Sequence, residues 1–235
     1  MIVAKFNTTK TVSGSSSSSQ LQLPFSNSGT YNCVVDWGDG STDTITSWNQ
    51  AETLHTYTTA GEYTVEITGP CPGFQTYSAI DGSKLTEVIS FDCALVGRTS
   101  MTNTFRDAAN LIAGGSITGT SSVTDFTNCW RGCSSMTQPP DTSSWDTSSV
   151  TTFAQCWEGC SFRSHDYDRL LNQLLASSPR SGVPMHGGSS KYTYQGKPSR
   201  DALLAIGWNI SDNGIDPNWP DPRFTGIGRQ RRLGT

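Results

Sequence analysis

The sequence predicts a mostly β protein of two modules, a sandwich of short strands followed by a stack of repeated coils that helices cap. Three observations carry this prediction. Only 34% of the 235 residues are hydrophobic and 15% are charged, so Ser, Thr, Asn and Gly supply much of the polarity, which suits short strands and turns. Turn signals recur about every 8–12 residues in the first third of the chain. Finally, the block 122–134 is repeated 27 residues later, at 149–161, with nine of thirteen positions identical.

Composition and charge narrow the classes of function. The net charge of −4 argues against a general nucleic-acid binder, which needs a basic face to displace phosphate counterions. No apolar run reaches about 18 residues, so we expect no membrane insertion. The N-terminus has no apolar run of signal-peptide length, so the chain as given is not expected to follow the general secretory route unless a leader was removed. The seven cysteines leave at least one thiol unpaired in a monomer, and the redox compartment stays open.

The first module begins with polar and alternating segments. Residues 13–20, Ser-Gly followed by five serines and Gln20, predict either a flexible linker or a long solvated hairpin loop. Short strands are predicted after it, because β-branched and aromatic residues alternate with polar ones between turn signals. These strands are expected at 21–25, 31–37, 42–46, 55–57 and 62–67.

Three motifs in this module occur in a characteristic order. They are Val35-Asp36-Trp37-Gly38-Asp39-Gly40-Ser41, then His55-Thr56-Tyr57, then Ala60-Gly61-Glu62-Tyr63-Thr64-Val65. With them, residues 1–69 resemble the polycystic-kidney-disease (PKD) type of immunoglobulin-like domain. The resemblance implies a β-sandwich in which Trp37 fills the space between the sheets, and a spacer or adhesion role without catalysis.

Pro70-Cys71-Pro72-Gly73 marks a boundary, because two prolines end a sheet. We expect a linker at 70–79 and repeats with their cap at 80–215. The segment 100–108 is a degenerate copy, with Met101 at the position of Phe126 and Phe105 at that of Trp130. The insertion 114–119 is expected to bulge as a loop.

The segment 145–151, Trp-Asp-Thr-Ser-Ser-Val-Thr, precedes a Phe-x-x-Cys element. This pattern resembles the BspA-like class of leucine-rich repeats, over about residues 80–212. The resemblance implies a solenoid. Trp130 and Trp157 depart from the family, which usually has Phe there.

Two helices are expected to cover the last apolar face of the repeats. The first is amphipathic and spans 166–175. The second is expected to start at Ser199 as its N-cap and to run to Gly207, before a short closing strand at 208–210. The tail 216–235 contains the basic cluster Arg229, Arg231 and Arg232, and is either a docking arm for an acidic partner or a solvated unstructured end.

Cysteines and acidic residues raise the question of metals. The pairs Cys129–Cys133 and Cys156–Cys160 supply four thiols for zinc, but equivalent positions of stacked repeats also form a buried ladder of small apolar thiols, and we favour the ladder. Disulfides are a third option. The carboxylates of Asp36, Asp39 and Asp43 suggest calcium but lack the spacing of a calcium loop, so turn capping is favoured.

No catalytic constellation is evident. The histidines, His55, His165 and His186, lie in no hydrolase motif, and no glycine-flanked serine elbow or phosphate loop is present. A Cys/His protease and a carboxylate pair for sugar hydrolysis stay formal alternatives. Exposed aromatic residues are the remaining candidates for recognition, since an indole ring can stack on a sugar or anchor a protein. The candidates are Trp48, Trp145, Trp219 and either Tyr192 or Tyr194.

These inferences predict a non-enzymatic surface protein with no catalytic residue, cofactor or metal. The two resemblances together look like modules of bacteriophage virion proteins, so we expect a capsid decoration protein or a tail or fibre component at the virion surface. Its partners would be other virion proteins and a host surface protein or glycan, and self-association stays open. The alternatives are a bacterial cell-surface adhesin and an accessory module of a carbohydrate-active enzyme.

Overall fold

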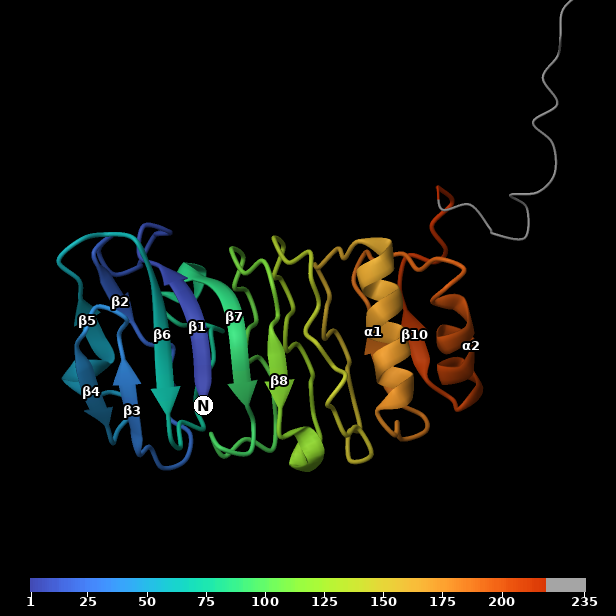
Figure 1. Ribbon diagram of the computed structural model, residues 1–235, viewed down its shortest axis with the longest axis horizontal. Helices are drawn as coiled ribbons and strands as arrows, with labels where there is room; N and C mark the ends of the chain where they lie inside the picture. Colours follow the sequence, from blue (N-terminus) through green and yellow to red (C-terminus); the bar gives the residue numbers. More distant parts are fainter. Residues whose placement is uncertain (219–235) are drawn as a thin grey trace, which may run out of the picture.

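A computed structural model describes residues 1–218, and within them the chain is mostly β with two α-helices. The molecule is elongated, with the N-terminal strands at one end and the helices at the other (Figure 1). One sheet has the strand order β4-β3-β6-β1-β7-β8, and the pairs β2-β5 and β9-β10 form two smaller sheets. The strands are β1 (Ile2–Asn7), β2 (Gln20–Gln22), β3 (Cys33–Asp36), β4 (Thr42–Ile45), β5 (Leu54–Thr56), β6 (Glu62–Thr68), β7 (Leu85–Asp92), β8 (Ser116–Thr118), β9 (Pro184–His186) and β10 (Asn209–Ser211).

Strand β1 joins the two expected modules. Its side chains alternate, so that Ile2, Ala4 and Phe6 are buried, and its backbone pairs antiparallel with β6 on one side and β7 on the other. No strand was predicted at these residues from the sequence. One sheet therefore runs from residues 1–69 into the segment expected to hold the repeats.

The segment 70–79, expected as a linker, packs into the fold. Phe74 is fully buried and forms an edge contact with Phe91, with ring centroids 5.9 Å apart. The Thr76 backbone N–H donates to the Thr104 carbonyl at 2.8 Å. This segment therefore contributes side chains to the same core as the strands on either side of it.

A buried ion pair anchors the serine-rich loop between β1 and β2. The side chains of Lys84 and Asp81 are fully buried, with Nζ and Oδ2 3.3 Å apart. Lys84 Nζ also donates to the backbone carbonyls of Ser16, Ser17 and Gln20, at 3.2, 2.9 and 2.7 Å. Residues 13–20 were expected to form either a flexible linker or a loop between strands. The structure fits the loop, which the buried side chain of Lys84 holds in place.

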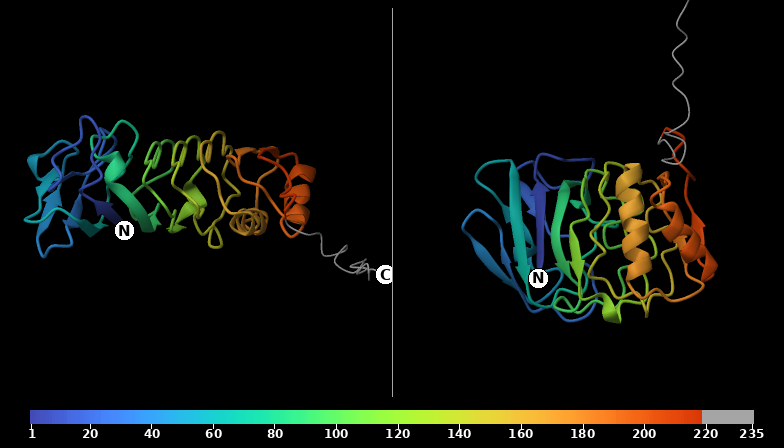
Figure 2. Two further views of the ribbon diagram at one scale, coloured as in Figure 1. Left: turned by 90° about the horizontal axis from the view of Figure 1, so that it is seen from above. Right: turned by 45° about the vertical axis from the view of Figure 1, so that its right-hand side comes forward.

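The repeated blocks lie side by side. The Phe105 N–H donates to the Cys129 carbonyl and the Trp130 N–H to the Cys156 carbonyl, both at 2.8 Å. The aromatic rings stack in the same order, with centroids 5.5 Å apart for Phe105 and Trp130 and 5.8 Å for Trp130 and Trp157. The degenerate copy thus aligns in space as it does in sequence. Successive coils run parallel to one another beyond β8 (Figures 1 and 2).

The insertion 114–119 forms strand β8, which contradicts the expected loop. β8 pairs parallel with β7, and Gly115 has φ of 63° and lies so close to the Val88 carbonyl that a Cβ would be 2.1 Å from its oxygen. A glycine is therefore what lets this segment enter the sheet.

The C-terminal end carries α1 (Ser164–Ala176) and α2 (Lys197–Ala205). Helix α1 buries Leu170, Leu171 and Leu174, as its amphipathic pattern predicts. Ser199 does not cap α2: Gly196 is at the N-cap, and Pro198, which suits the first turn of a helix, lies between them. Strand β10 pairs parallel with β9, at the end of the stack. Neither helix in residues 1–218 is long and apolar enough to cross a membrane.

Candidate functional site

A groove of about 550 Å³ lies beside the small β2–β5 sheet. Its walls come from β2 and the residues after it, from the turn before β5, and from the turn near residue 80. None of the lining residues carries a charge: Gln22, Leu23, Phe25, Trp48, Asn49, Gln50, Ala51, Thr53, Leu54, Ser78, Ala79 and Ile80. We call this surface the Trp48 groove.

Apolar side chains of the groove are open to solvent. Trp48 is 38% exposed, Leu54 41% and Ile80 55%, whereas Trp37, Trp130 and Trp157 in the core are fully buried. Large apolar side chains that gather around a groove and stay exposed are typical of a recognition surface. Trp48 is one of the contact residues predicted from the sequence, and its exposed position agrees with that role.

The turn that carries Trp48 is held by one amide side chain. Gln50 Oε1 accepts the backbone N–H groups of Thr46 and Ser47 at 2.7 and 3.1 Å, and Gln50 Nε2 donates to the Thr44 carbonyl at 2.8 Å. Gln22 Nε2 also donates to Thr53 Oγ1 at 2.8 Å, next to this turn. These bonds fix the backbone around the indole, so a ligand meets a largely pre-formed surface.

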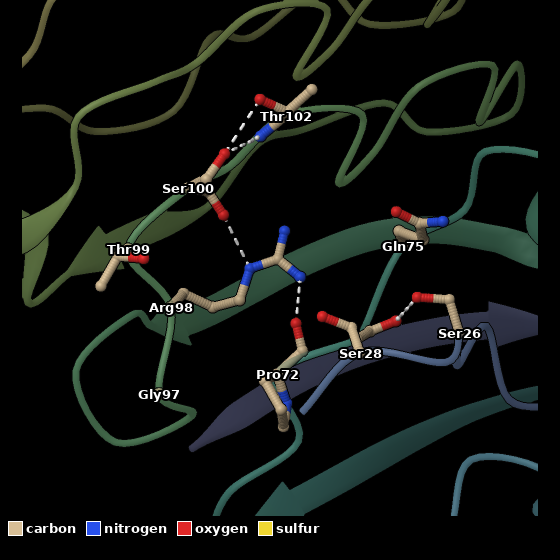
Figure 3. A pocket seen from close by; sticks show the side chains of 10 residues that line it. Ser26, Ser28, Pro72, Gln75, Gly97, Arg98, Thr99, Ser100 and Thr102 are labelled. Atoms are coloured by element: carbon tan, nitrogen blue, oxygen red, sulfur yellow. Dashed lines mark hydrogen bonds between the residues drawn. The ribbon is translucent and has the colours of Figure 1, made fainter. Parts of the chain in front are cut away.

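A second, polar pocket of about 240 Å³ surrounds the guanidinium of Arg98, and it shares no lining residue with the Trp48 groove. Arg98 is only 9% exposed. As Figure 3 shows, its guanidinium lies between the Ser100 and Pro72 carbonyls. We call this the Arg98 pocket.

The three carboxylates considered for calcium each bond locally. Asp36 Oδ1 accepts the Gly38 N–H at 2.9 Å, Asp39 Oδ1 accepts the Ser41 N–H at 3.0 Å, and Asp43 Oδ2 accepts the Trp37 indole N–H at 2.8 Å. The bonds of Asp36 and Asp39 agree with turn capping, whereas Asp43 lies on strand β4 and bonds an indole instead. Burial opposes ionisation of Asp39, but the bonds from Ser41 and His55 outweigh it and lower its pKa to about 2. Within residues 1–218 no three His, Cys, Asp or Glu side chains gather as metal ligands would.

The repeat cysteines are buried thiols. Cys133 Sγ donates to the Phe105 carbonyl at 3.0 Å, and Cys160 Sγ to the Trp130 carbonyl at 3.2 Å, in both cases one coil back. Burial raises the pKa of Cys129 and Cys156 well above the usual value, so both thiols stay protonated as small apolar groups. The geometry thus fits the predicted ladder.

A further pair of thiols meets outside the repeats. Cys33 on β3 and Cys71 after β6 are both buried, and the backbone bond from Asn32 N–H to the Pro70 carbonyl, 3.0 Å, brings their positions together. A hydrogen bond with Cys71 lowers the pKa of Cys33, while that bond and burial raise the pKa of Cys71.

The other candidates from the sequence are spread over the molecule. Trp145 is only 4% exposed, stacks on Phe126 and donates from its indole to the Ile117 carbonyl at 2.9 Å, so its expected surface role is wrong. Tyr192 and Tyr194 are half-buried near the C-terminal end. His186, expected in a turn, is the last residue of β9.

Four candidates fall outside the described residues. They are Trp219 and the basic cluster Arg229, Arg231 and Arg232.

Several site residues were not identified from the sequence. Leu54 and Ile80 are far apart in the chain, and only the fold brings both of them to Trp48. Arg98 stands in the otherwise uncharged stretch Val96–Met101, and a single charge in such a stretch is a weak signal that could have drawn attention to it.

Comparisons with known proteins identify one similarity. A family model described as DUF285, a Mycoplasma protein of unknown function, matches residues 75–173. No curated protein and no solved structure matches the chain. The chain is therefore similar to the DUF285 family over 75–173, a range that lies largely within the segment where the sequence predicts repeats.

Proposed function

We propose that this chain is a non-enzymatic surface protein that binds a neutral glycan in the Trp48 groove, and that it is a component of the virion surface. The observation that carries the binding proposal is the exposed indole of Trp48 in a groove whose lining is wholly uncharged.

The chemistry of the groove matches a sugar. The flat indole offers an apolar face to the C–H groups of a pyranose, and Leu54 and Ile80 extend that face. The amide N–H₂ of Asn49 and the hydroxyl of Ser78 bond no other group in the described part of the chain, and so can meet sugar hydroxyls. Because no lysine, arginine or carboxylate lines the groove, a neutral saccharide suits it better than an acidic one.

The proposal includes the finer assignment of the fold. We assign residues 1–69 to a PKD-type immunoglobulin-like sandwich and the coils after them to BspA-like leucine-rich repeats. The buried Trp37, the stacked repeat blocks and the family match at 75–173 support this assignment. Strand β1 ties both parts into one sheet, so the groove would be carried at the end of a continuous body.

The virion proposal follows from the pairing of these two modules, which resembles the architecture of phage decoration, tail and fibre proteins. Cryo-electron microscopy of virions or capsids lacking the protein, after mixing with it, tests this part. Extra density at symmetric capsid or tail positions supports it. Retention on bacterial cells without virion binding would favour the adhesin instead. If deletion of 217–235 leaves virion binding unchanged, the arginine cluster is not the docking arm.

A glycan array with the full-length protein tests the groove. We expect retention on neutral oligosaccharides and a loss of roughly tenfold or more in affinity for Trp48→Ala. Ile112→Ala is the matched control, because Ile112 is also a large exposed apolar residue, 51% exposed, but lies outside the groove. Equal losses for the two variants, or preferential binding of acidic glycans, would contradict the proposal.

A further inference from the structure

The charge of Arg98 has no counter-ion in the described structure. None of the ion pairs within residues 1–218 includes it. A buried charge is costly unless it is paired and hydrogen-bonded, and here burial is the main influence that lowers the pKa of the guanidinium. Arg98 is thus a buried cation that only neutral groups surround.

Four of the five N–H donors of Arg98 have neutral acceptors. Nε donates to the Ser100 carbonyl at 2.9 Å, and Nη1 donates to the carbonyls of Pro72 and Phe74 at 2.5 and 3.1 Å. Nη2 donates to Thr104 Oγ1 at 2.6 Å, which leaves one Nη2 hydrogen unused. The four bonds fix the plane of the guanidinium, so the fifth donor has a fixed direction.

Other free donors line the same pocket. The Gln75 amide and the hydroxyls of Ser28 and Thr99 bond no other group in the described residues. Figure 3 shows Gln75 and Ser28 on one side of the guanidinium and Thr99 on the other. A cation and several neutral donors around one small cavity are the elements of an anion site, since an anion accepts from all of them.

We propose that the Arg98 pocket binds a small oxyanion, with one oxygen accepting from Arg98 Nη2 and others from Gln75, Ser28 or Thr99. The oxyanion is a carboxylate or a tetrahedral sulfate or phosphate group. The volume of about 240 Å³ admits such a group. This site is separate from the Trp48 groove and does not depend on the function proposed for it.

The test titrates the full-length protein with sodium acetate, sulfate or phosphate at constant ionic strength, with chloride as reference. Two-dimensional NMR follows the Arg98 Nε–H and the Gln75 side-chain amide. We expect saturable shifts of both signals. Saturation by acetate alone identifies a site for a carboxylate. Saturation by sulfate or phosphate identifies a site for a tetrahedral oxyanion. Shifts that rise linearly with every salt would overturn the proposal.

Variants that spare the contacts of Arg98 complete the test. Gln75→Ala should weaken binding about tenfold, the value of one hydrogen bond to a charged group. Ser28→Glu should place a carboxylate at the mouth of the pocket, abolish anion binding and raise the midpoint of thermal unfolding. Ser134→Glu, at an exposed position in the repeated block 122–134, makes the same charge change as a control. If both glutamate variants reduce binding equally, the effect is general electrostatics and the site does not exist.

Discussion

Two tryptophans of the stacked coils bury indole N–H groups without a partner. The Nε1 atoms of Trp130 and Trp157 have no acceptor, although both side chains are fully buried. An unsatisfied buried donor costs about 1–3 kcal/mol. Trp145 gives the opposite case, because its indole donates to the Ile117 carbonyl at 2.9 Å. The two kinds of tryptophan should therefore respond differently to the same substitution.

The substitution is Trp→Phe. It loses roughly 40 Å² of buried apolar area, about 1 kcal/mol, and the remaining cavity adds about another 1 kcal/mol. For Trp157 the removal of the unsatisfied N–H returns about 1–3 kcal/mol, so the free energy of unfolding should change by less than about 1 kcal/mol. For Trp145 the lost hydrogen bond adds about 1 kcal/mol, so Trp145→Phe should cost about 3 kcal/mol.

The assay is guanidinium chloride unfolding followed by far-UV circular dichroism, since tryptophan fluorescence changes with the substitution itself. Trp157→Ala serves as a reference for complete loss of the ring and should cost about 3–5 kcal/mol. If Trp157→Phe destabilises the protein as much as Trp145→Phe, the indole of Trp157 has a partner after all, and the reasoning fails.

Three further predictions concern stability. Lys84→Met should lower the free energy of unfolding by about 3–5 kcal/mol and make residues 13–20 accessible to proteases, because it leaves Asp81 buried without its cation. Proteolysis that does not change would contradict the conclusion that Lys84 anchors this loop. Gln155 has a φ of 54°, a left-handed backbone conformation that Asn tolerates better than Gln. Gln155→Asn should therefore raise the free energy of unfolding by about 0.5 kcal/mol in the same assay, and a decrease would refute this prediction. The lowered pKa of Asp39, about 2, contributes stability that is fully present above about pH 4 and is lost as the pH falls through 2. In Asp39→Asn the free energy of unfolding should therefore decrease less as the pH falls below about 4, and an unchanged decrease would show that Asp39 is not responsible.

Local patterns predicted much of the local structure. The 27-residue offset aligned Trp130 with Trp157, the degenerate copy at 100–108 aligned Phe105 with both of them, and alternation located the strands β3 to β6. These predictions depend on residues that are close in sequence or related by a repeat, so composition and spacing are enough to make them.

Long-range pairing could not be predicted in the same way. The alternation of Ile2, Ala4 and Phe6 is visible, but nothing local indicates that this strand lies between β6 and β7. Trp145 has the neighbours of a loop residue yet is buried, because the next coil covers it. The Trp48 groove and the Arg98 pocket likewise combine segments from several parts of the chain.

The most direct test of the proposed function follows the tryptophan indole N–H signals by NMR, while the full-length protein is titrated with neutral disaccharides such as lactose, maltose and diacetylchitobiose. Binding in the groove predicts a saturable shift of the Trp48 indole signal, and the buried indoles of Trp130 and Trp157 should stay in place. Saturable binding that leaves the Trp48 signal unmoved, or no binding of any neutral saccharide, would contradict the account.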